Sequence, residues 1–198
     1  MMIERLLTVN DYSRPGRSLG EVLGVVLHWT ANPNAGAVAT RNYFESKKSG
    51  TGGYASAHYV VGQDGEVVRC IPECEVAYHC GTDRPDPKSG LVYTEDARRR
   101  FGHYATNYRT ESPNMCTIGV ELCPDDWSGS FSGKTLRAAA ELCAGILIRH
   151  NLGTDALTTH GAVVGWKDCP KLWVHNPALF GSFVLDVASW MGKLRGCE

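Results

Sequence analysis

The chain has 198 residues, of which 43% are hydrophobic and 21% are charged, and its formal net charge is −1. This length is typical of a single domain that buries about 70% of the surface of its unfolded chain, and the near-zero charge argues against a nucleic acid or an anionic membrane as the partner. The longest apolar runs fall far short of the ~20 residues that a bilayer-spanning helix needs.

The N-terminal residues 1–18 lack the long apolar core and the small-residue cleavage site of a secretory signal, so we expect synthesis in the cytoplasm. The β-branched run over residues 23–30 ends near His28 and predicts a buried strand. Residues 37–50 carry apolar side chains at helical spacing and predict a helix that stops at Gly50.

Two β-rich runs within residues 57–71 flank an Asp-Gly turn and predict a hairpin. Residues 117–123 predict a further strand, in which Glu121 faces away from its apolar neighbours because side chains alternate along a strand. Between them, residues 81–116 are polar and contain several prolines and arginines, which indicates a long surface excursion with room for a short helix.

Residues 132–151 carry apolar side chains at helical spacing, with Ser132 as the expected N-cap. A short strand over 155–160 and an amphipathic helix over 178–195 follow. Strands and helices alternate, and the hairpin requires one antiparallel pair, so we predict an α/β fold with a central mixed β-sheet flanked by α-helices. We expect one domain over residues 1–198.

Eight cysteines are many for a cytosolic product, but a chain of this length has an adequate core without disulfides. Cys123 in a strand and Cys143 on the apolar stripe of a helix are expected to be buried free thiols. Cys70, Cys74 and Cys80 lack the paired C-x2-C spacing of structural zinc sites, so we interpret them as structural, with a metal knuckle as the alternative.

One short stretch combines residues with metal and charge chemistry: residues 158–173 read TTHGAVVGWKDCPKLW and contain His160, Lys167 and Cys169. Catalytic zinc usually takes three protein ligands and leaves a fourth position open. His28, His160 and Cys169 are the candidates, because strand ends bring side chains together at the rim of a sheet. Two neutral imidazoles and a thiolate would leave one positive charge at the metal, enough to acidify water and polarise a carbonyl.

Five pieces of the chain carry a family resemblance, in the order VVLHWTA, SAHYVVGQDGEV, VAYHCG, TIGVELC and THGAVVGWKDCP. With them the chain resembles the zinc-dependent N-acetylmuramoyl-L-alanine amidases of the type-2 family, which includes phage and prophage endolysins and the animal peptidoglycan-recognition proteins. The matching pieces span residues 24–173, and the last is the most specific. The resemblance implies one zinc ion per chain, held by His28, His160 and Cys169.

The resemblance also implies roles for two polar residues. Lys167 matches a lysine that stabilises the oxyanion of the tetrahedral intermediate, with a solvated loop lysine as the alternative. Several family members carry a catalytic tyrosine where this chain has Ala57, which argues against tyrosine-type catalysis here. Other members place a glutamate in the IGVEL strand, and Glu121 stands at that position. A carboxylate in an apolar strand is costly to bury, so we interpret Glu121 as the general base, with a structural ion pair as the alternative.

Three further residues are candidates for contact with the substrate. His79 matches a family histidine that lines the substrate groove. Trp29 and Trp166 flank ligand positions and are expected to form apolar walls of the cleft, with core packing as an equal alternative. The remaining histidines are interpreted as structural: His58, His103, His150 and His175.

The predicted function is hydrolysis of the amide bond between N-acetylmuramic acid and L-alanine in peptidoglycan. The enzyme would act on the cell wall after holin-type or lysis-dependent release, either unaided or with a separate wall-binding region. One alternative is a peptidoglycan-binding module without catalysis; the presence of Cys169 argues against it. The other is a thiol amidase with Cys169 as nucleophile and His160 as base.

A last expectation concerns residues 82–115, which show no core periodicity. The segment begins just after His79 and ends just before the strand that carries Glu121. We therefore expect it to form one wall of the groove and to help select the peptide stem.

Overall fold

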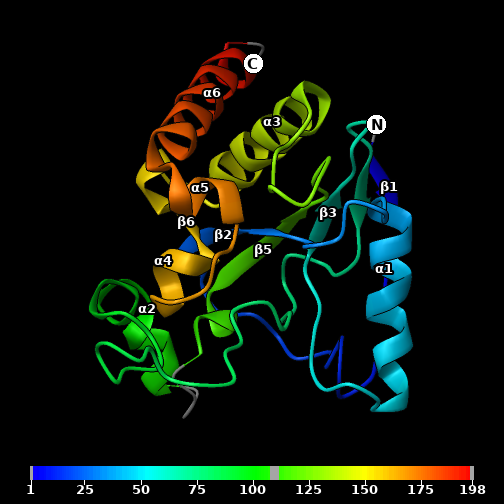
Figure 1. Ribbon diagram of the computed structural model, residues 1–198, viewed down its shortest axis with the longest axis vertical. Coiled ribbons are helices and arrows are strands. Elements are labelled where there is room, and N and C mark those ends of the chain that lie inside the picture. Colours follow the sequence, from blue (N-terminus) through cyan, green and yellow to red (C-terminus); the bar gives the residue numbers. More distant parts are fainter. Residues whose placement is uncertain (1, 108–111, 197–198) are drawn as a thin grey trace.

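The structure is a computed structural model that describes residues 2–107 and 112–196, with side chains for residues 2–102 and 112–196 (Figure 1). One six-stranded sheet has the order β1-β4-β3-β5-β2-β6. Its strands are β1 (Met2–Glu4), β2 (Gly24–Trp29), β3 (Tyr59–Val61), β4 (Val67–Arg69), β5 (Thr117–Leu122) and β6 (Leu157–Thr159). The β3–β4 hairpin is antiparallel and the other described pairings are parallel, so the predicted mixed sheet is confirmed.

Six α-helices surround the sheet within the described residues. They are α1 (Ala37–Ser46), α2 (Glu95–Asn107), α3 (Gly133–Arg149), α4 (His160–Val164), α5 (Lys171–His175) and α6 (Pro177–Arg195). Short 3-10 turns lie at Lys47–Ser49, Pro113–Met115 and Thr154–Ala156. The Oγ of Ser132 accepts a hydrogen bond of 3.0 Å from the Thr135 N–H, so the predicted N-cap of α3 is confirmed.

The main hydrophobic core lies on one face of the sheet, where α3 and α6 lie side by side (Figure 1). Val120 and Leu122 of β5 point into this core and are fully buried. Because side chains alternate along a strand, Glu121 between them is directed to the opposite face, as predicted.

The opposite face carries two separate hydrophobic clusters. The first, called here the α1 cluster, joins Phe44 of α1 to Val60 and Val68 of the hairpin. The second, called here the α2–α4 cluster, joins Phe101 of α2 and Val163 of α4 to strand β2. A groove lies between these two clusters, over the ends of β2 and β5.

The polar segment before β5 differs from the expectation of a surface excursion. Its helix α2 buries Ala97 and Phe101, and Tyr93 joins them in the α2–α4 cluster. The two helical residues are four positions apart and so share one face. Ala97 and Phe101 cover a single helical repeat and lie among many charged side chains, so the sequence of α2 shows no clear apolar periodicity. The segment is therefore part of the core as well as of the surface.

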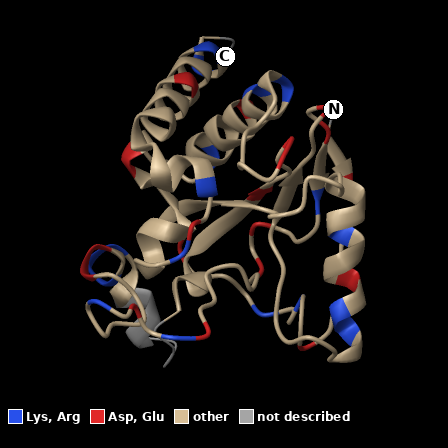
Figure 2. Cartoon of the chain, in the orientation of Figure 1, with Lys and Arg blue, Asp and Glu red and all other residues tan. Residues whose placement is uncertain are grey.

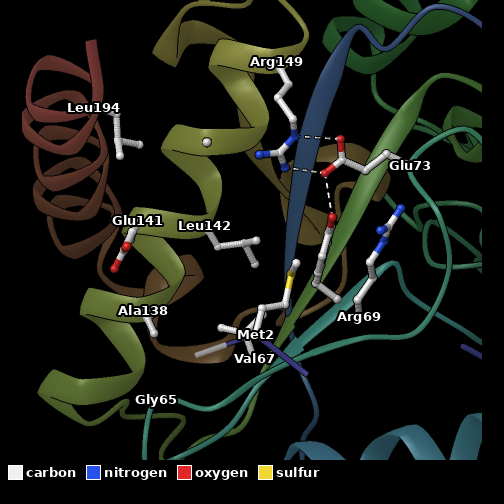
Figure 3. Close-up of a pocket in the computed structure, with 12 residues that line it drawn as sticks. Met2, Gly65, Val67, Arg69, Glu73, Ala138, Glu141, Leu142, Arg149 and Leu194 are labelled. Carbon is white, nitrogen blue, oxygen red and sulfur yellow. Dashed lines mark hydrogen bonds and ion pairs between the residues drawn. The ribbon is translucent and has the colours of Figure 1, made fainter. Parts of the chain in front are cut away.

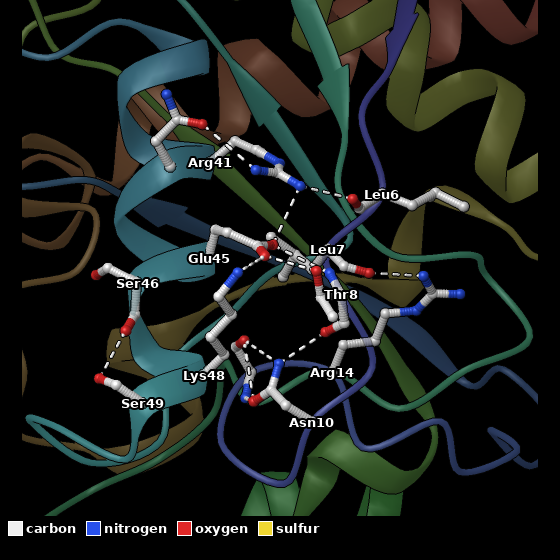
Figure 4. Close-up of polar contacts among 12 residues, drawn as sticks. Leu6, Leu7, Thr8, Asn10, Arg14, Arg41, Glu45, Ser46, Lys48 and Ser49 are labelled. Atoms are coloured by element: carbon white, nitrogen blue, oxygen red, sulfur yellow. Dashed lines mark hydrogen bonds and ion pairs between the residues drawn. The ribbon is translucent and has the colours of Figure 1, made fainter.

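The segment before β2 is held against α1 by polar contacts (Figure 4). The Arg41 guanidinium donates to the Leu6 carbonyl at 2.6 Å. Glu45 accepts hydrogen bonds from the Thr8 hydroxyl at 2.6 Å and from the Thr8 N–H at 3.0 Å. These contacts hold the N-terminal segment in place. The sequence predicted no helix or strand in this segment, but its first residues form strand β1.

A partly buried polar cluster connects the hairpin to the end of α3 (Figure 3). The carboxylate of Glu73 accepts a hydrogen bond of 2.7 Å from the Tyr59 hydroxyl and pairs with Arg149 at 2.6 Å and with His150 at 2.8 Å. Burial acts to raise the pKa of Glu73, but the hydrogen bonds from Arg149, Tyr59 and His150 outweigh it and lower the pKa to about 2. Residue His150 is therefore structural, as predicted.

Basic and acidic residues are interspersed along the chain (Figure 2), in keeping with the net charge of −1. Among the helices that the structure describes, none has the combination of length and apolar character needed to cross a membrane.

Candidate active site

The floor of the groove is set by the pairing of two parallel strands. In the β2–β5 register, His28 stands opposite Glu121. Both strands are mostly apolar and buried, so these two polar side chains stand out on the face that the groove exposes. Sequence positions 93 residues apart thus become neighbours through strand pairing.

His160 reaches the same place from strand β6. It is the first residue of α4, whose N-terminus is capped by the Thr159 hydroxyl at 3.2 Å from the Ala162 N–H. The sequence predicted no helix between the strand over 155–160 and the helix over 178–195, so this short helix is an addition to the predicted elements. The Nε2 of His160 lies 3.1 Å from the Gly81 carbonyl oxygen. Since a carbonyl only accepts, Nε2 carries the proton and Nδ1 keeps its lone pair.

Cys169 follows α4 in a turn that folds back on the helix. Its carbonyl accepts a hydrogen bond of 2.7 Å from the Gly161 N–H. Its Sγ lies 3.8 Å from Nδ1 of His28. One donor atom from each of His28, His160 and Cys169 lies within 4.8 Å of the others, so the fold brings the three predicted ligands together.

The chemistry of these three side chains fits a zinc ion. Burial, followed by the nearby charges of His160, His79 and Lys167, holds the pKa of His28 well below its usual value. Burial and then the charge of Lys167 lower the pKa of His160 to about 3. Both imidazoles are therefore neutral ligands at pH 7. Two imidazoles and one sulfur, with a side open to the groove, match the donor set of catalytic zinc sites.

Glu121 has an environment that favours its protonated form and offers it no structural partner among the described residues. Its Oε2 is buried and has no hydrogen-bond partner among the described residues. Burial raises the pKa of Glu121 to about 8. A structural ion pair was the alternative, but the described Lys and Arg side chains form no salt bridge with it. A carboxylate left orphaned at the floor of a groove points to a functional role.

The groove has a volume of about 1040 Å³ and is lined by all eight residues that the sequence singled out: His28, Trp29, His79, Glu121, His160, Trp166, Lys167 and Cys169. On the side of the α2–α4 cluster, the Nζ of Lys167 donates to the Gly81 carbonyl at 2.7 Å. The Trp166 indole N–H lies 3.2 Å from both the Thr82 hydroxyl and the Arg84 carbonyl. The Arg84 guanidinium in turn covers the Trp166 ring, 4.2 Å from its centre.

The other wall contains two aromatic residues that the sequence did not single out. The rings of Tyr54 and Tyr78 are 5.3 Å apart in an edge-to-face arrangement, and Tyr54 is 64% exposed. Arg84 was also missed as an individual residue. The Gly-rich surroundings of Tyr54 and the polar surroundings of Arg84 carry no periodic signal, so only the folded arrangement identifies these residues.

Two histidines lie deeper than the groove surface. His58 is fully buried; its Nδ1 accepts from the Gly119 N–H and its Nε2 lies 2.9 Å from the Glu75 carbonyl oxygen, as expected for a structural residue. His79 is 6% exposed, and its Nδ1 lies 3.1 Å from Nε2 of His28. It reaches the floor of the groove, but both of its ring nitrogens already have partners in the protein.

The other candidates have ordinary environments. The seven cysteines within the described residues are free thiols. Cys70 and Cys74 belong to neither of the two candidate metal groups found among those residues, so the metal knuckle does not form there. His175 is exposed and pairs with Asp168 at 3.3 Å. The side chain of His103 lies outside the described ones.

Comparison with known proteins gives a consistent family. Residues 18–172 match the Amidase_2 family model, described as N-acetylmuramoyl-L-alanine amidase. A probable N-acetylmuramoyl-L-alanine amidase of Bacillus licheniformis is 34% identical over 192 residues, covering 97% of this chain and 48% of that protein. The amidase CwlL of the same species is 32% identical, with coverage of 97% and 48%. The chain thus spans about half the length of these curated relatives.

Solved structures show the same fold. The catalytic domain of XlyA superposes with a TM-score of 0.67 at 23% identity, covering 94% of this chain and 99% of that one. The solution structure of the PlyG catalytic domain gives 0.69 at 19% identity, covering 96% and 95%. The match over most of the chain, the identity to curated relatives and the shared fold confirm the resemblance seen in the sequence: this chain belongs to the N-acetylmuramoyl-L-alanine amidase family.

Proposed function

We propose that this chain hydrolyses the amide bond between N-acetylmuramic acid and L-alanine of peptidoglycan, in a zinc-dependent reaction. The observation that carries the proposal is the convergence of His28, His160 and Cys169 beside the orphaned carboxylate of Glu121. The catalytic domain is taken as residues 1–198, with the motif-bearing core at 24–173.

Zinc held by these two imidazoles and the thiolate would supply a Lewis acid that acidifies water and polarises the scissile carbonyl. Burial raises the pKa of Glu121 to about 8, and the positive charge of a zinc ion in this cluster would favour its ionised form. The ionised carboxylate is the general base: it accepts a proton from the attacking water and returns it to the leaving amine. Its position beside His28 in the strand register places the carboxylate at the edge of the ligand cluster. The Lys167 ammonium, directed toward Gly81 at the rim, is available to stabilise the developing oxyanion.

The two walls of the groove suit the two parts of the substrate. The exposed ring of Tyr54, backed by Tyr78, offers an apolar face for a sugar ring. The Arg84 guanidinium, held on Trp166, offers a positive charge for the carboxylates of a stem peptide. We therefore assign selection of the peptide stem to residues 81–84 rather than to the whole segment 82–115, whose helix belongs to the core.

In this proposal the substrate is the cell wall, which the enzyme reaches after holin-type or lysis-dependent release. The thiol-amidase alternative is disfavoured, because burial and then the charge of Glu121 raise the pKa of the Cys169 thiol well above its usual value. That mechanism would also leave His28 and Glu121 without a role. A purely binding module would likewise not need a buried, unpaired carboxylate beside three metal donors.

The test is mass spectrometry of purified peptidoglycan after digestion, with and without a zinc chelator. We expect intact stem peptides with a free L-alanine amino terminus, and their loss when the chelator is present. Cleavage that continues with the chelator would contradict the zinc-dependent reaction. Cleavage at a glycosidic bond or within the stem would contradict the amidase assignment.

A further inference from the structure

His79 is enclosed by a set of contacts that define its protonation pattern. Its Nε2 lies 3.3 Å from the Thr117 carbonyl oxygen and 3.4 Å from the Thr117 hydroxyl. That hydroxyl donates its own proton to the Pro113 carbonyl at 2.7 Å. Both neighbours of Nε2 are therefore acceptors, so Nε2 carries the proton and donates it.

The opposite nitrogen of the ring then has a lone pair and must accept. Nδ1 of His79 lies 3.1 Å from Nε2 of His28 and 3.2 Å from the Cys80 sulfur. For a hydrogen bond to form across the first contact, Nε2 of His28 has to carry the proton. Nδ1 of His28 is then unprotonated, and this is the nitrogen 3.8 Å from Cys169 Sγ.

His28 and His160 differ in the kind of group that orients the imidazole ring. His160 is oriented by a backbone carbonyl, that of Gly81, which can only accept. His28 is oriented by another imidazole, which accepts only in one of its own tautomers. The carbonyl of Thr117, the first residue of β5 and the partner of Gly24 in β2, fixes that tautomer of His79.

The ring of His79 is also held sterically. It lies against Gly119 of β5, where a Cβ atom would overlap its Cγ, Cδ2 and Nδ1 atoms. Its backbone N–H donates to the Asn114 side-chain oxygen at 3.0 Å. Gly119 and Asn114 thus hold the His79 ring edge-to-face against the ring of His28, with 5.2 Å between the ring centres.

On the basis of the proposed zinc-dependent function, we propose that His79 is a positioning residue that holds His28 in the Nε2-protonated tautomer, so that its Nδ1 lone pair faces the zinc site. The relay runs from the Thr117 carbonyl through His79 to His28. Loss of such an outer partner typically weakens metal binding about 10–100-fold.

A second metal shared by His28, His79 and Cys80 is the competing interpretation, since these three also form a compact donor group. The separations of 3.1 Å and 3.2 Å from Nδ1 of His79 are those of hydrogen bonds. The two interpretations predict different metal contents. The relay requires one zinc per chain, and the shared site requires two.

The direct test needs no substitution: nitrogen-15 NMR of the imidazole rings in the zinc-free and zinc-loaded protein. We expect His28 and His79 to be Nε2-protonated in both forms, and only His28, of these two, to show metal coordination at Nδ1. A zinc-free protein in which His28 is protonated at Nδ1 would overturn the proposal. So would coordination of a metal by His79.

Zinc affinity, measured by competition with a chromophoric chelator, gives a second readout. His79→Leu, which removes both the donor and the acceptor, should weaken zinc binding about 10–100-fold. His79→Gln, whose amide both donates and accepts, should restore part of that loss. His150→Leu removes a half-buried histidine from the opposite face and should leave the zinc affinity unchanged.

Wild-type zinc affinity in a folded His79→Leu protein would contradict the relay, as would two zinc ions bound per wild-type chain. If the variant does not fold, the NMR experiment on the wild-type chain decides. A chain with the expected tautomers and a single zinc that releases no stem peptides would retain this inference and refute the proposed function.

Discussion

Glu121 lowers the stability of the fold but is the residue to which we assign the role of general base. Its Oε2 atom is buried and has no partner within the part of the chain that the structure describes, an arrangement that costs folding free energy. Glu121→Gln keeps the shape and removes the base. We expect the variant to fold, to bind zinc as the parent does, and to lose about 10²–10⁴-fold in turnover on muropeptides. Turnover near that of the parent would assign Glu121 a structural role.

The ligand assignment makes a second prediction at this scale. Cys169→Ala and His160→Ala should each abolish the one zinc per chain, measured by elemental analysis after dialysis, since three protein donors are the usual minimum at a catalytic site. His175→Ala, which alters an exposed histidine paired with Asp168, is the matched control and should keep its zinc. Full zinc content in Cys169→Ala would redirect the search to the other donor group, His28, His79 and Cys80.

Helix α2 shows how an element that looks like surface can stabilise the molecule. Phe101 is 1% exposed and packs in the α2–α4 cluster. Phe101→Ala should therefore lower the free energy of unfolding by about 3–5 kcal/mol in urea titrations. Arg99→Ala on the exposed side of the same helix, where the side chain is 79% exposed, should change it by less than about 0.5 kcal/mol. Equal effects of the two substitutions would show that α2 contributes no core.

Comparison of the elements with the sequence shows where local patterns suffice. The six-residue strands β2 and β5, the hairpin and helices α3 and α6 have unbroken periodicity, and their positions were predicted. Helix α4 was missed because its five residues are too short for a periodic pattern. Strand β1 was missed because its three residues are exposed and pair only at the edge of the sheet.

Some features of the candidate site could likewise be predicted from local sequence, and others could not. The convergence of His28, His160 and Cys169 could be predicted because each of them lies in a distinctive stretch of sequence. The depth of His79 could not, because it depends on the contact with Gly119, 40 positions away. The neighbours of Glu121 depend equally on strand register, which no local pattern specifies.

For the molecule as a whole, the Glu73 cluster links folding to pH. The pKa of Glu73 is about 2 in the folded chain against an ordinary value of 4.5. An acid whose pKa is lowered by folding stabilises the protein above its unfolded value, and that stability is lost as the pH falls from about 4.5 to 2. Glu73→Gln should cost on the order of 2 kcal/mol at pH 7 and little at pH 2. Thermal unfolding across this range measures it; a difference that is independent of pH would contradict the ion-pair account.

The two clusters on the groove face have a consequence for how such a domain can diversify. The α1 cluster supports one wall, while the α2–α4 cluster supports the other wall together with helix α4, whose first residue is His160. His28 and Glu121 belong to the strands between the two clusters. Substitutions in the wall beside the α1 cluster are therefore expected to leave the packing around α4 and the strand register intact, whereas substitutions in the other wall also affect the helix that begins at His160. Under the proposed function, a lineage that encounters a new wall chemistry can change the side assigned to the sugar without disturbing the proposed zinc ligands, whereas change on the side assigned to the peptide is constrained by His160.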